Sequence, residues 1–181
     1  ASHMKKHLLA GAVVAALALI QAGPLATDAA AAEKATENAA EVARADWYHT
    51  LVDAAFVAQH AVLPKPEGVL IIDARPSTRK YDPGHIPTAI NIPDTQFDKH
   101  IDRLPQDKNT LLIFYCDGVE CMLSHKSAFK AEKLGYTQVR VYPAGYPDWL
   151  ASGHIGAISV PYLKKLMDEG AGQMQGPFDY S

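Results

Sequence analysis

The chain of 181 residues carries 17 lysine and arginine side chains against 20 aspartate and glutamate side chains, which gives a formal net charge of −3 at pH 7. No basic stripe suits nucleic acid as a partner, and the sequence contains no Gly-rich phosphate loop, haem-attachment motif or internal repeat. Once the predicted N-terminal leader is subtracted, roughly 150 residues remain, which is enough for one domain with a proper core.

The N-terminal segment has the pattern of an export signal. Residues 1–3 resemble a remnant of cloning, and from Met4 the chain shows a lysine pair, an apolar run of 13 residues and an alanine-rich stretch. Thirteen apolar residues are fewer than the roughly 20 that span a bilayer. We therefore expect residues 4–32 to be a cleaved signal peptide and residues 33–45 a leader segment. The mature protein is then expected in the periplasm, with no membrane attachment.

The chain after the leader predicts alternating helices and strands. Asp46 is the candidate N-cap of a first helix that runs toward His60. Four short runs, three of them apolar throughout or nearly so, then predict strands at residues 69–73, 89–93, 111–115 and 138–142.

Further helices are predicted between and after these strands. Helical patterns occupy residues 95–104 and 122–134, and the second of these ends at Gly135. A last amphipathic helix begins after Ser159 and is predicted to end at Gly170.

Near-continuous apolar strands that alternate with helices are typical of a parallel sheet covered on both faces. The sequence therefore predicts an α/β domain over residues 46–153, with a central parallel sheet between helices. An extra C-terminal helix and a loose tail are expected within residues 154–181.

Both cysteines, Cys116 and Cys121, lie between the strand at residues 111–115 and the next helix. In open parallel sheets, active sites lie just beyond the carboxyl ends of the strands. A loop there can turn backbone N–H groups inward, and the helix N-terminus adds partial positive charge, which favours a thiolate and binds an anion. Cys116 is therefore the candidate catalytic nucleophile. The candidate anion cradle is the backbone of Asp117, Gly118, Val119, Glu120 and Met122.

The side chains of this loop oppose a strongly acidic thiol, because Asp117 and Glu120 flank it and the loop contains no arginine or lysine. One charge about 6 Å away costs under roughly 1 kcal/mol in water-like surroundings and about 3 kcal/mol at intermediate screening. A helix terminus returns about 0.3–2 kcal/mol. We expect a reactive thiol that is not exceptionally acidic.

The role of Cys121 stays open between three alternatives. It could resolve a persulfide on Cys116, form a disulfide with Cys116, or only pack. A helical loop would hold the two cysteines too far apart, since bridged Cα atoms lie within about 7 Å. Cys116, Cys121 and His125 lack a fourth nearby ligand for zinc, so no metal and no cofactor are predicted.

Several motifs occur in a fixed order from about residue 46 to residue 153. They are Asp73-x-Arg75, Gly84-His85-Ile86-Pro87, the strand-end Cys116, Gly135-Tyr136, and Ala144-Gly145 ahead of Trp149. This combination resembles a single-domain rhodanese, here an exported form with an extended two-cysteine loop. The resemblance implies sulfurtransfer: the cysteine takes a sulfane sulfur from a small donor anion or polysulfide and passes it to a thiol or another nucleophile.

The loop departs from the family pattern in its charge and its length. The commonest rhodanese loop places arginine or lysine five residues after the cysteine and serine next to it, whereas here these positions fall on Cys121 and, later, Ser124. The related phosphatases carry arginine six residues after the cysteine, where this chain has Met122. The missing cation favours a polysulfide or persulfide donor over thiosulfate.

Three functional hypotheses follow. The first is a sulfurtransferase that carries sulfane sulfur on Cys116. The second is a reductase of polysulfide or a chalcogen oxyanion that works through a Cys116–Cys121 disulfide and consumes a thiol reductant. The third is a binding module without catalysis. The oligomeric state and the role of the last helix stay open.

Side chains outside the loop are expected to support it. Asp73 and Arg75 are predicted to form a structural ion pair, and His85 to anchor its turn by hydrogen bonds. Ser124 and His125 belong to the first turn of the next helix, where His125 is expected to face solvent; the alternative is that it supplies the positive charge that the loop lacks.

Overall fold

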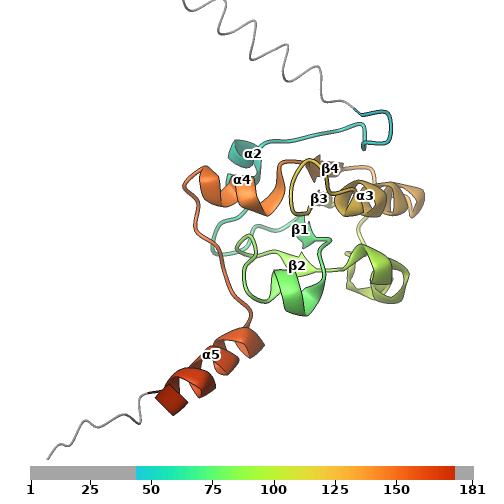
Figure 1. The fold of residues 1–181 in the computed structure, drawn as a ribbon. Coiled ribbons are helices and arrows are strands. Elements are labelled where there is room, and N and C mark those ends of the chain that lie inside the picture. The colour runs from blue at the N-terminus through green and yellow to red at the C-terminus, as the bar shows by residue number, and fades with distance from the viewer. Residues whose placement is uncertain (1–43, 174–181) are drawn as a thin grey trace, which may run out of the picture. The chain divides into compact units, whose positions relative to one another are not determined.

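The computed structural model describes residues 44–173 (Figure 1). The predicted signal peptide over residues 4–32, residues 1–3, and nearly all of the leader over residues 33–45 lie outside the described residues. Residues 174–181 of the predicted tail lie outside them as well. None of the helices in the described part of the chain has the length and apolar character that a bilayer crossing requires.

Four parallel strands form one sheet in the order β2-β1-β3-β4 (Figure 1). Their bounds are β1 Val69–Asp73, β2 Ile90–Asn91, β3 Leu111–Tyr115 and β4 Val139–Tyr142. The register pairs Asp73 with Tyr115 and Tyr115 with Tyr142, so the carboxyl ends of β1, β3 and β4 are level. The predicted parallel sheet is confirmed, and the segments after these strands meet at one edge.

Both faces of the sheet are covered, as predicted. On one face, side chains of β1 and β3 pack against η2 (Asp94–Arg103) and α3 (Leu123–Lys133). On the other face, the alternate side chains of the same strands pack against α2 (Ala54–Ala58) and α4 (Gly145–Ala151). Successive side chains of a strand point to opposite faces, so strands that are apolar throughout supply both clusters.

The first predicted helix is wrong over most of its length. The chain before α2 is not helical: Leu51 forms a parallel bridge with Val141, and the Val52 N–H donates to the Val141 carbonyl at 2.9 Å. α2 begins only after Asp53, whose side chain accepts the Phe56 N–H at 2.8 Å. Strand β4 lies at the edge of the sheet, and this segment satisfies backbone groups that the edge would otherwise expose.

Two other helices differ from their predicted form. η2 is 3₁₀-helical and is interrupted at His100, where φ is −122°. The last helix, α5 (Val160–Gln173), begins after Ser159 as predicted but runs past Gly170, its predicted end. One glycine in a helix costs only about 1 kcal/mol, which does not by itself stop the helix. At the end of α3, by contrast, Gly135 has a φ of +91° and ends the helix as predicted.

His125 does not face solvent, which corrects the prediction. Its side chain is fully buried, its Nδ1 accepts the Tyr48 N–H at 2.9 Å, and its ring stacks on Trp47 with centroids 4.8 Å apart. The segment before α2 covers the start of α3, and the sequence around His125 gives no sign of this cover. Burial lowers the pKa of His125 to about 4.

This buried imidazole predicts a specific acid sensitivity. The pKa of His125 is about 4 when folded and about 6.5 when unfolded. The unfolded state therefore binds more protons between these values, and stability falls as the pH falls through that window. Between pH 7 and pH 4.5 the wild type should lose about 2 kcal/mol more than His125→Asn.

Urea unfolding at several pH values measures this difference. The carboxamide that the His125→Asn substitution introduces can still accept the Tyr48 N–H but does not titrate. Glu132, whose pKa is lowered by hydrogen bonds from Tyr48 and His49, is present in both proteins and cancels. Parallel stability curves for the two proteins would contradict the prediction.

Candidate active site

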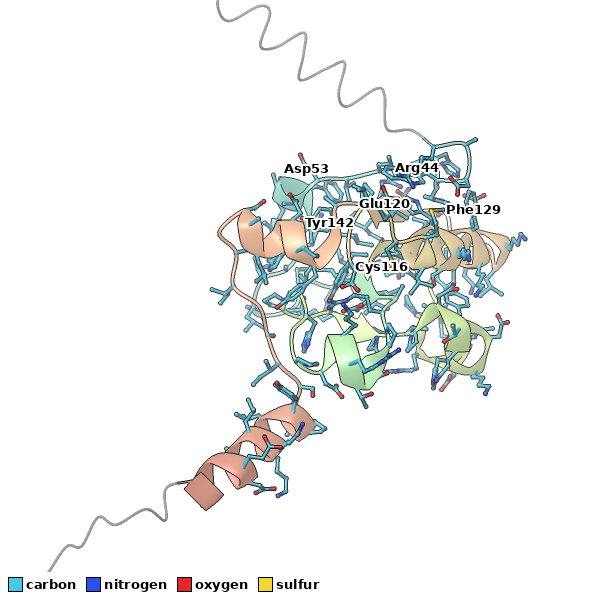
Figure 2. The ribbon with its side chains drawn as sticks, in the orientation of Figure 1. Arg44, Asp53, Cys116, Glu120, Phe129 and Tyr142 are labelled. Carbon is cyan, nitrogen blue, oxygen red and sulfur yellow. A yellow bond between two sulfur atoms is a disulfide. The ribbon has the colours of Figure 1, made fainter. Side chains whose placement is uncertain are left out.

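Cys116 follows β3 directly and lies in the loop that leads to α3, at the carboxyl edge of the sheet (Figure 2). Only 1% of its surface is exposed. The Cys116 carbonyl accepts the Tyr146 N–H at 2.9 Å, so the start of α4 holds the first residue of the loop. The candidate nucleophile is thus fixed by two elements that are separated in sequence.

Gly145 permits this close approach. Its φ is +67°, and a Cβ built on it would overlap the Cys116 carbonyl oxygen and lie 2.7 Å from the Gly118 nitrogen. Both the conformation and the contact therefore require glycine. The Ala144-Gly145 motif found in the sequence is the turn on which the cysteine loop rests.

Cys116 and Cys121 form a disulfide, with their Cα atoms 6.1 Å apart. The loop is a turn and not a helix at this point, because the Cys121 N–H donates to the Gly118 carbonyl at 2.9 Å and α3 begins only at Leu123. Of the alternatives left open for Cys121, the structure therefore contains the bridged one. Met122 lies immediately before the helix.

The acidic residues of the loop pair with cations from distant parts of the chain. Asp117 lies 3.1 Å from the Arg75 guanidinium and 3.0 Å from the Lys80 ammonium. Glu120 forms two hydrogen bonds with Arg44, which lower the pKa of that carboxyl. These pairs offset the negative charge that the sequence places beside the thiol. Sequence reasoning missed Lys80 and Arg44, since no local pattern links them to a loop 37 and 76 residues away.

The predicted ion pair of Asp73 and Arg75 is present and buried. Arg75 donates to Asp73 through Nη2 at 2.6 Å and through Nε at 2.9 Å, and also to the Gly84 carbonyl at 2.7 Å. The Tyr115 hydroxyl donates to Asp73 at 2.7 Å. Burial opposes the charge of Arg75, but the hydrogen bonds and the charge of Asp73 outweigh it and raise the pKa of the guanidinium.

His85 anchors its turn, as predicted. Its Nδ1 lies 2.8 Å from the Tyr81 carbonyl, its ring stacks on Tyr81, and its backbone exchanges two hydrogen bonds with Ala157. Ser124 is buried in the first turn of α3, and its hydroxyl has no hydrogen-bond partner among the described residues. Neither side chain lines the groove beside the loop.

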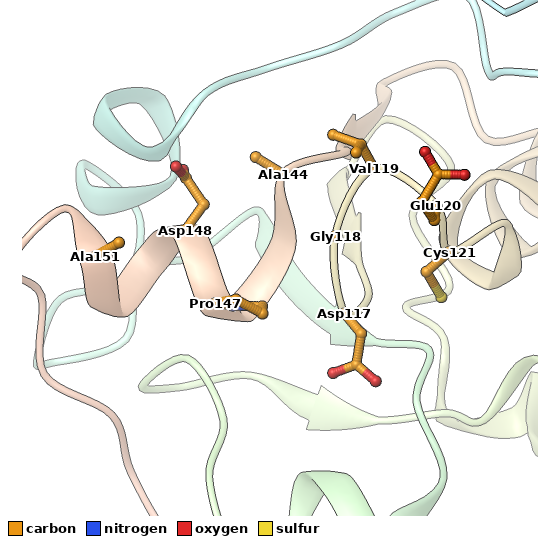
Figure 3. A pocket seen from close by; sticks show the side chains of 9 residues that line it. All are labelled: Asp117, Gly118, Val119, Glu120, Cys121, Ala144, Pro147, Asp148 and Ala151. Carbon is orange, nitrogen blue, oxygen red and sulfur yellow. The ribbon is translucent and has the colours of Figure 1, made fainter.

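An open groove of about 760 Å³ lies between the cysteine loop and α4 (Figure 3). Its walls are formed by Asp117, Gly118, Val119, Glu120, Cys121, Ala144, Pro147, Asp148 and Ala151. Cys121 is thus one of the lining residues, whereas Cys116 is buried and does not line the groove. The groove is bordered by three carboxylates, and no lysine or arginine is among the described residues that line it. Sequence reasoning did not find the α4 wall. Within residues 44–173, no cluster of three or more His, Cys, Asp or Glu side chains suits a metal ion.

The domain is an α/β fold with a parallel sheet. A cysteine loop follows its inner strand β3 at the carboxyl end, and a buried Asp–Arg pair braces this loop. The family model for the Rhodanese-like domain matches residues 57–152. The chain belongs to this family.

Solved structures share the fold. The BH2092 protein of Bacillus halodurans is 23% identical with a TM-score of 0.54, over 71% of this chain and 86% of that one. A rhodanese-like domain from Anabaena is 20% identical with a TM-score of 0.51, over 62% and 82%. A thiosulfate sulfurtransferase from Pseudomonas aeruginosa is 21% identical with a TM-score of 0.51, over 61% and 19%.

One curated relative also matches part of the chain. An HTH-type transcriptional regulator of Mycobacterium tuberculosis is 31% identical over 85 residues, which are 47% of this chain and 36% of that protein. The chain thus spans about a third of the length of this relative.

The contact of Gly145 with the loop predicts unequal effects at two glycines. Gly145 and Gly153 both have positive φ, but a Cβ on Gly153 would meet nothing within 4 Å. Gly153→Ala should therefore cost only the conformational term of about 1–2 kcal/mol. Gly145→Ala adds overpacking against the loop and should cost about 2–5 kcal/mol in total. Urea unfolding of both variants measures the difference; equal losses would show that the loop does not rest on this turn.

Proposed function

We propose that the protein is a sulfurtransferase that carries sulfane sulfur as a persulfide on Cys116. One observation carries the proposal: Cys116 lies at the carboxyl end of β3, in a loop held by the turn before α4. Within residues 44–173, no hydrogen bond uses the backbone N–H groups of Asp117 to Glu120. Such groups can stabilise a thiolate or the charge of a bound persulfide. Membership of the Rhodanese-like domain family supports the same activity.

The transfer proceeds in two displacements on sulfur. In the reduced protein, the Cys116 thiolate attacks the sulfane sulfur of a donor, and the bond from that sulfur to the rest of the donor breaks. The donor leaves as a thiolate or sulfite, and Cys116 holds the persulfide. An acceptor thiolate then attacks the outer sulfur, and Cys116 leaves as the thiolate. No net oxidation or reduction occurs.

The charges around the groove favour a polysulfide or an organic persulfide over thiosulfate. Arg44, Arg75 and Lys80 are each paired with a carboxylate, and none of the described residues that line the groove is a lysine or arginine that could receive a dianion. An organic persulfide carries one negative charge, and a polysulfide spreads its charge over a longer sulfur chain, so both meet less repulsion from Asp148 than thiosulfate does.

A second candidate function is favoured by the Cys116–Cys121 disulfide. In this scheme the Cys121 thiolate attacks the inner sulfur of the Cys116 persulfide and expels hydrosulfide, which leaves the disulfide. A dithiol then supplies two electrons and restores both thiols. The protein would then be a reductase of polysulfide.

We also propose that the protein acts in the periplasm. The predicted signal peptide over residues 4–32 supports this location, and an oxidising compartment suits a disulfide.

Intact-protein mass spectrometry tests the proposal directly. The wild type, Cys121→Ser and Cys116→Ser are reduced, freed of reductant, and exposed separately to polysulfide and thiosulfate. We expect Cys121→Ser to gain one sulfur atom from polysulfide, and to gain it more slowly from thiosulfate. Cyanide should remove that sulfur, and Cys116→Ser should gain none.

The wild type distinguishes the two candidate functions. A stable extra sulfur on the wild type supports the sulfurtransferase. If the wild type loses two hydrogens and releases sulfide, while only Cys121→Ser keeps sulfur, the reductase is correct. If no variant gains sulfur from either donor, both activities are refuted.

A further inference from the structure

We propose that the thiol that opens the Cys116–Cys121 disulfide enters through the groove beside α4 and attacks the sulfur of Cys121, so that Cys116 leaves as the thiolate. This inference rests on the proposed function, because it concerns how the carrier cysteine becomes available. It assigns the groove to one kind of partner: a thiol reductant in which the groups around the reactive thiol are neutral or positively charged.

Access distinguishes the two sulfur atoms. Cys116 is 1% exposed and is not among the residues that line the groove. Cys121 is partly exposed and is one of the residues that line the groove, and Figure 3 shows its side chain on the limb of the loop that leads to α3. Thiol–disulfide exchange requires the attacking thiolate to reach one sulfur atom, so access selects the site of attack. A thiol in the groove meets Cys121.

The leaving group favours the same direction. Attack on Cys121 releases the Cys116 thiolate inside a loop whose N–H groups from Asp117 to Glu120 are unused among the described residues. Arg75 and Lys80 form salt bridges with the neighbouring Asp117. Attack on Cys116 would instead release a thiolate at Cys121, where the residue's own N–H already donates to the Gly118 carbonyl and where the neighbouring Glu120 is paired with a single cation, Arg44. A more stable leaving thiolate departs faster, so both effects direct attack to Cys121.

The reaction balances with a dithiol as the two-electron reductant. Its first thiolate forms a bond to the Cys121 sulfur as the bond to Cys116 breaks. The second thiolate of the reductant then attacks the reductant's first sulfur, which is bonded to Cys121 in this mixed disulfide, and Cys121 is released as a thiolate. The reductant departs as a disulfide, and Cys116 and Cys121 remain in the protein as thiols once they are protonated. With a monothiol, a second molecule performs the second step.

The carboxylates of the groove select the charge of this partner. Asp117 is already paired with Arg75 and Lys80, and Glu120 with Arg44, whereas Asp148, on the opposite wall, has no cation partner among the described residues. At about 6 Å in water-like screening, one charge changes the local concentration of a singly charged thiol about threefold. A cationic thiol should therefore react about tenfold faster than an anionic one at low salt.

The first experiment locates the attack. The oxidised full-length protein is mixed with 2-mercaptoethanol, trapped within seconds by excess N-ethylmaleimide, and digested with pepsin at low pH. Tandem mass spectrometry then assigns the two modifications. We expect mercaptoethanol on Cys121 and maleimide on Cys116. The reverse arrangement, or an equal mixture of both, would overturn the proposal.

The second experiment tests the groove. Rates of disulfide opening by cysteamine, 2-mercaptoethanol and mercaptoacetate are each divided by the rate with a small neutral disulfide, which removes intrinsic reactivity. We expect the corrected order cationic, neutral, anionic. Each substitution removes one negative charge, so Glu120→Gln and Asp148→Asn should each reduce the tenfold range to nearly onefold, and Glu169→Gln on α5 should not change it. An unchanged range in the two groove variants would refute the assigned surface.

Failure here is distinguishable from failure of the proposed function. Sulfur loading is measured on protein that is already reduced, so it does not depend on which sulfur the reductant attacks. If Cys116 accepts sulfur but the mixed disulfide forms on Cys116, the function stands and the inference fails. If the mixed disulfide forms on Cys121 but Cys116 accepts no sulfur, the reverse holds.

Discussion

The buried ion pair of Asp73 and Arg75 is the interaction on which the rest of the site depends. Asp73 is the last residue of β1 and receives the Tyr115 hydroxyl from the end of β3. Arg75 extends the network to the Gly84 carbonyl and to Asp117 in the cysteine loop. A buried charge that loses its partner costs about 3–5 kcal/mol, so these groups must be satisfied together. One guanidinium thereby fixes two strand ends, one turn and the start of the loop relative to each other.

The loop is held from two sides by different means. On the Arg75 side the contact is electrostatic, and on the Gly145 side it is backbone against backbone. The first contact offsets the charge of Asp117, and the second fixes the Cys116 carbonyl. Together they allow a loop with two acids and no cation of its own to surround a thiol.

Local sequence patterns predicted the architecture well, and the structure shows why. Strands such as Leu111–Tyr115 are apolar throughout because each face meets helices, so their composition alone indicates the fold. The position of Cys116 and the Asp73–Arg75 pair also followed from the sequence. What could not be predicted is contact between distant segments: Arg44 with Glu120, Lys80 with Asp117, and the burial of His125 under Trp47. The prediction of the first helix was wrong for the same reason: the apolar spacing indicates a helix, but residues before α2 pair with the exposed edge of β4 instead.

The segment from Arg44 to Val52 contacts three separate parts of the domain. Arg44 pairs with Glu120 in the cysteine loop, Tyr48 donates to His125 in α3, and Val52 donates to the edge strand β4. All of these contacts precede residue 57, where the family match begins. A recombinant fragment trimmed to the homologous region would therefore uncover the His125 imidazole, expose the edge of β4 and leave Glu120 unpaired beside the disulfide. The stability and thiol chemistry measured on such a fragment would reflect the loss of these contacts and would differ from those of the longer chain.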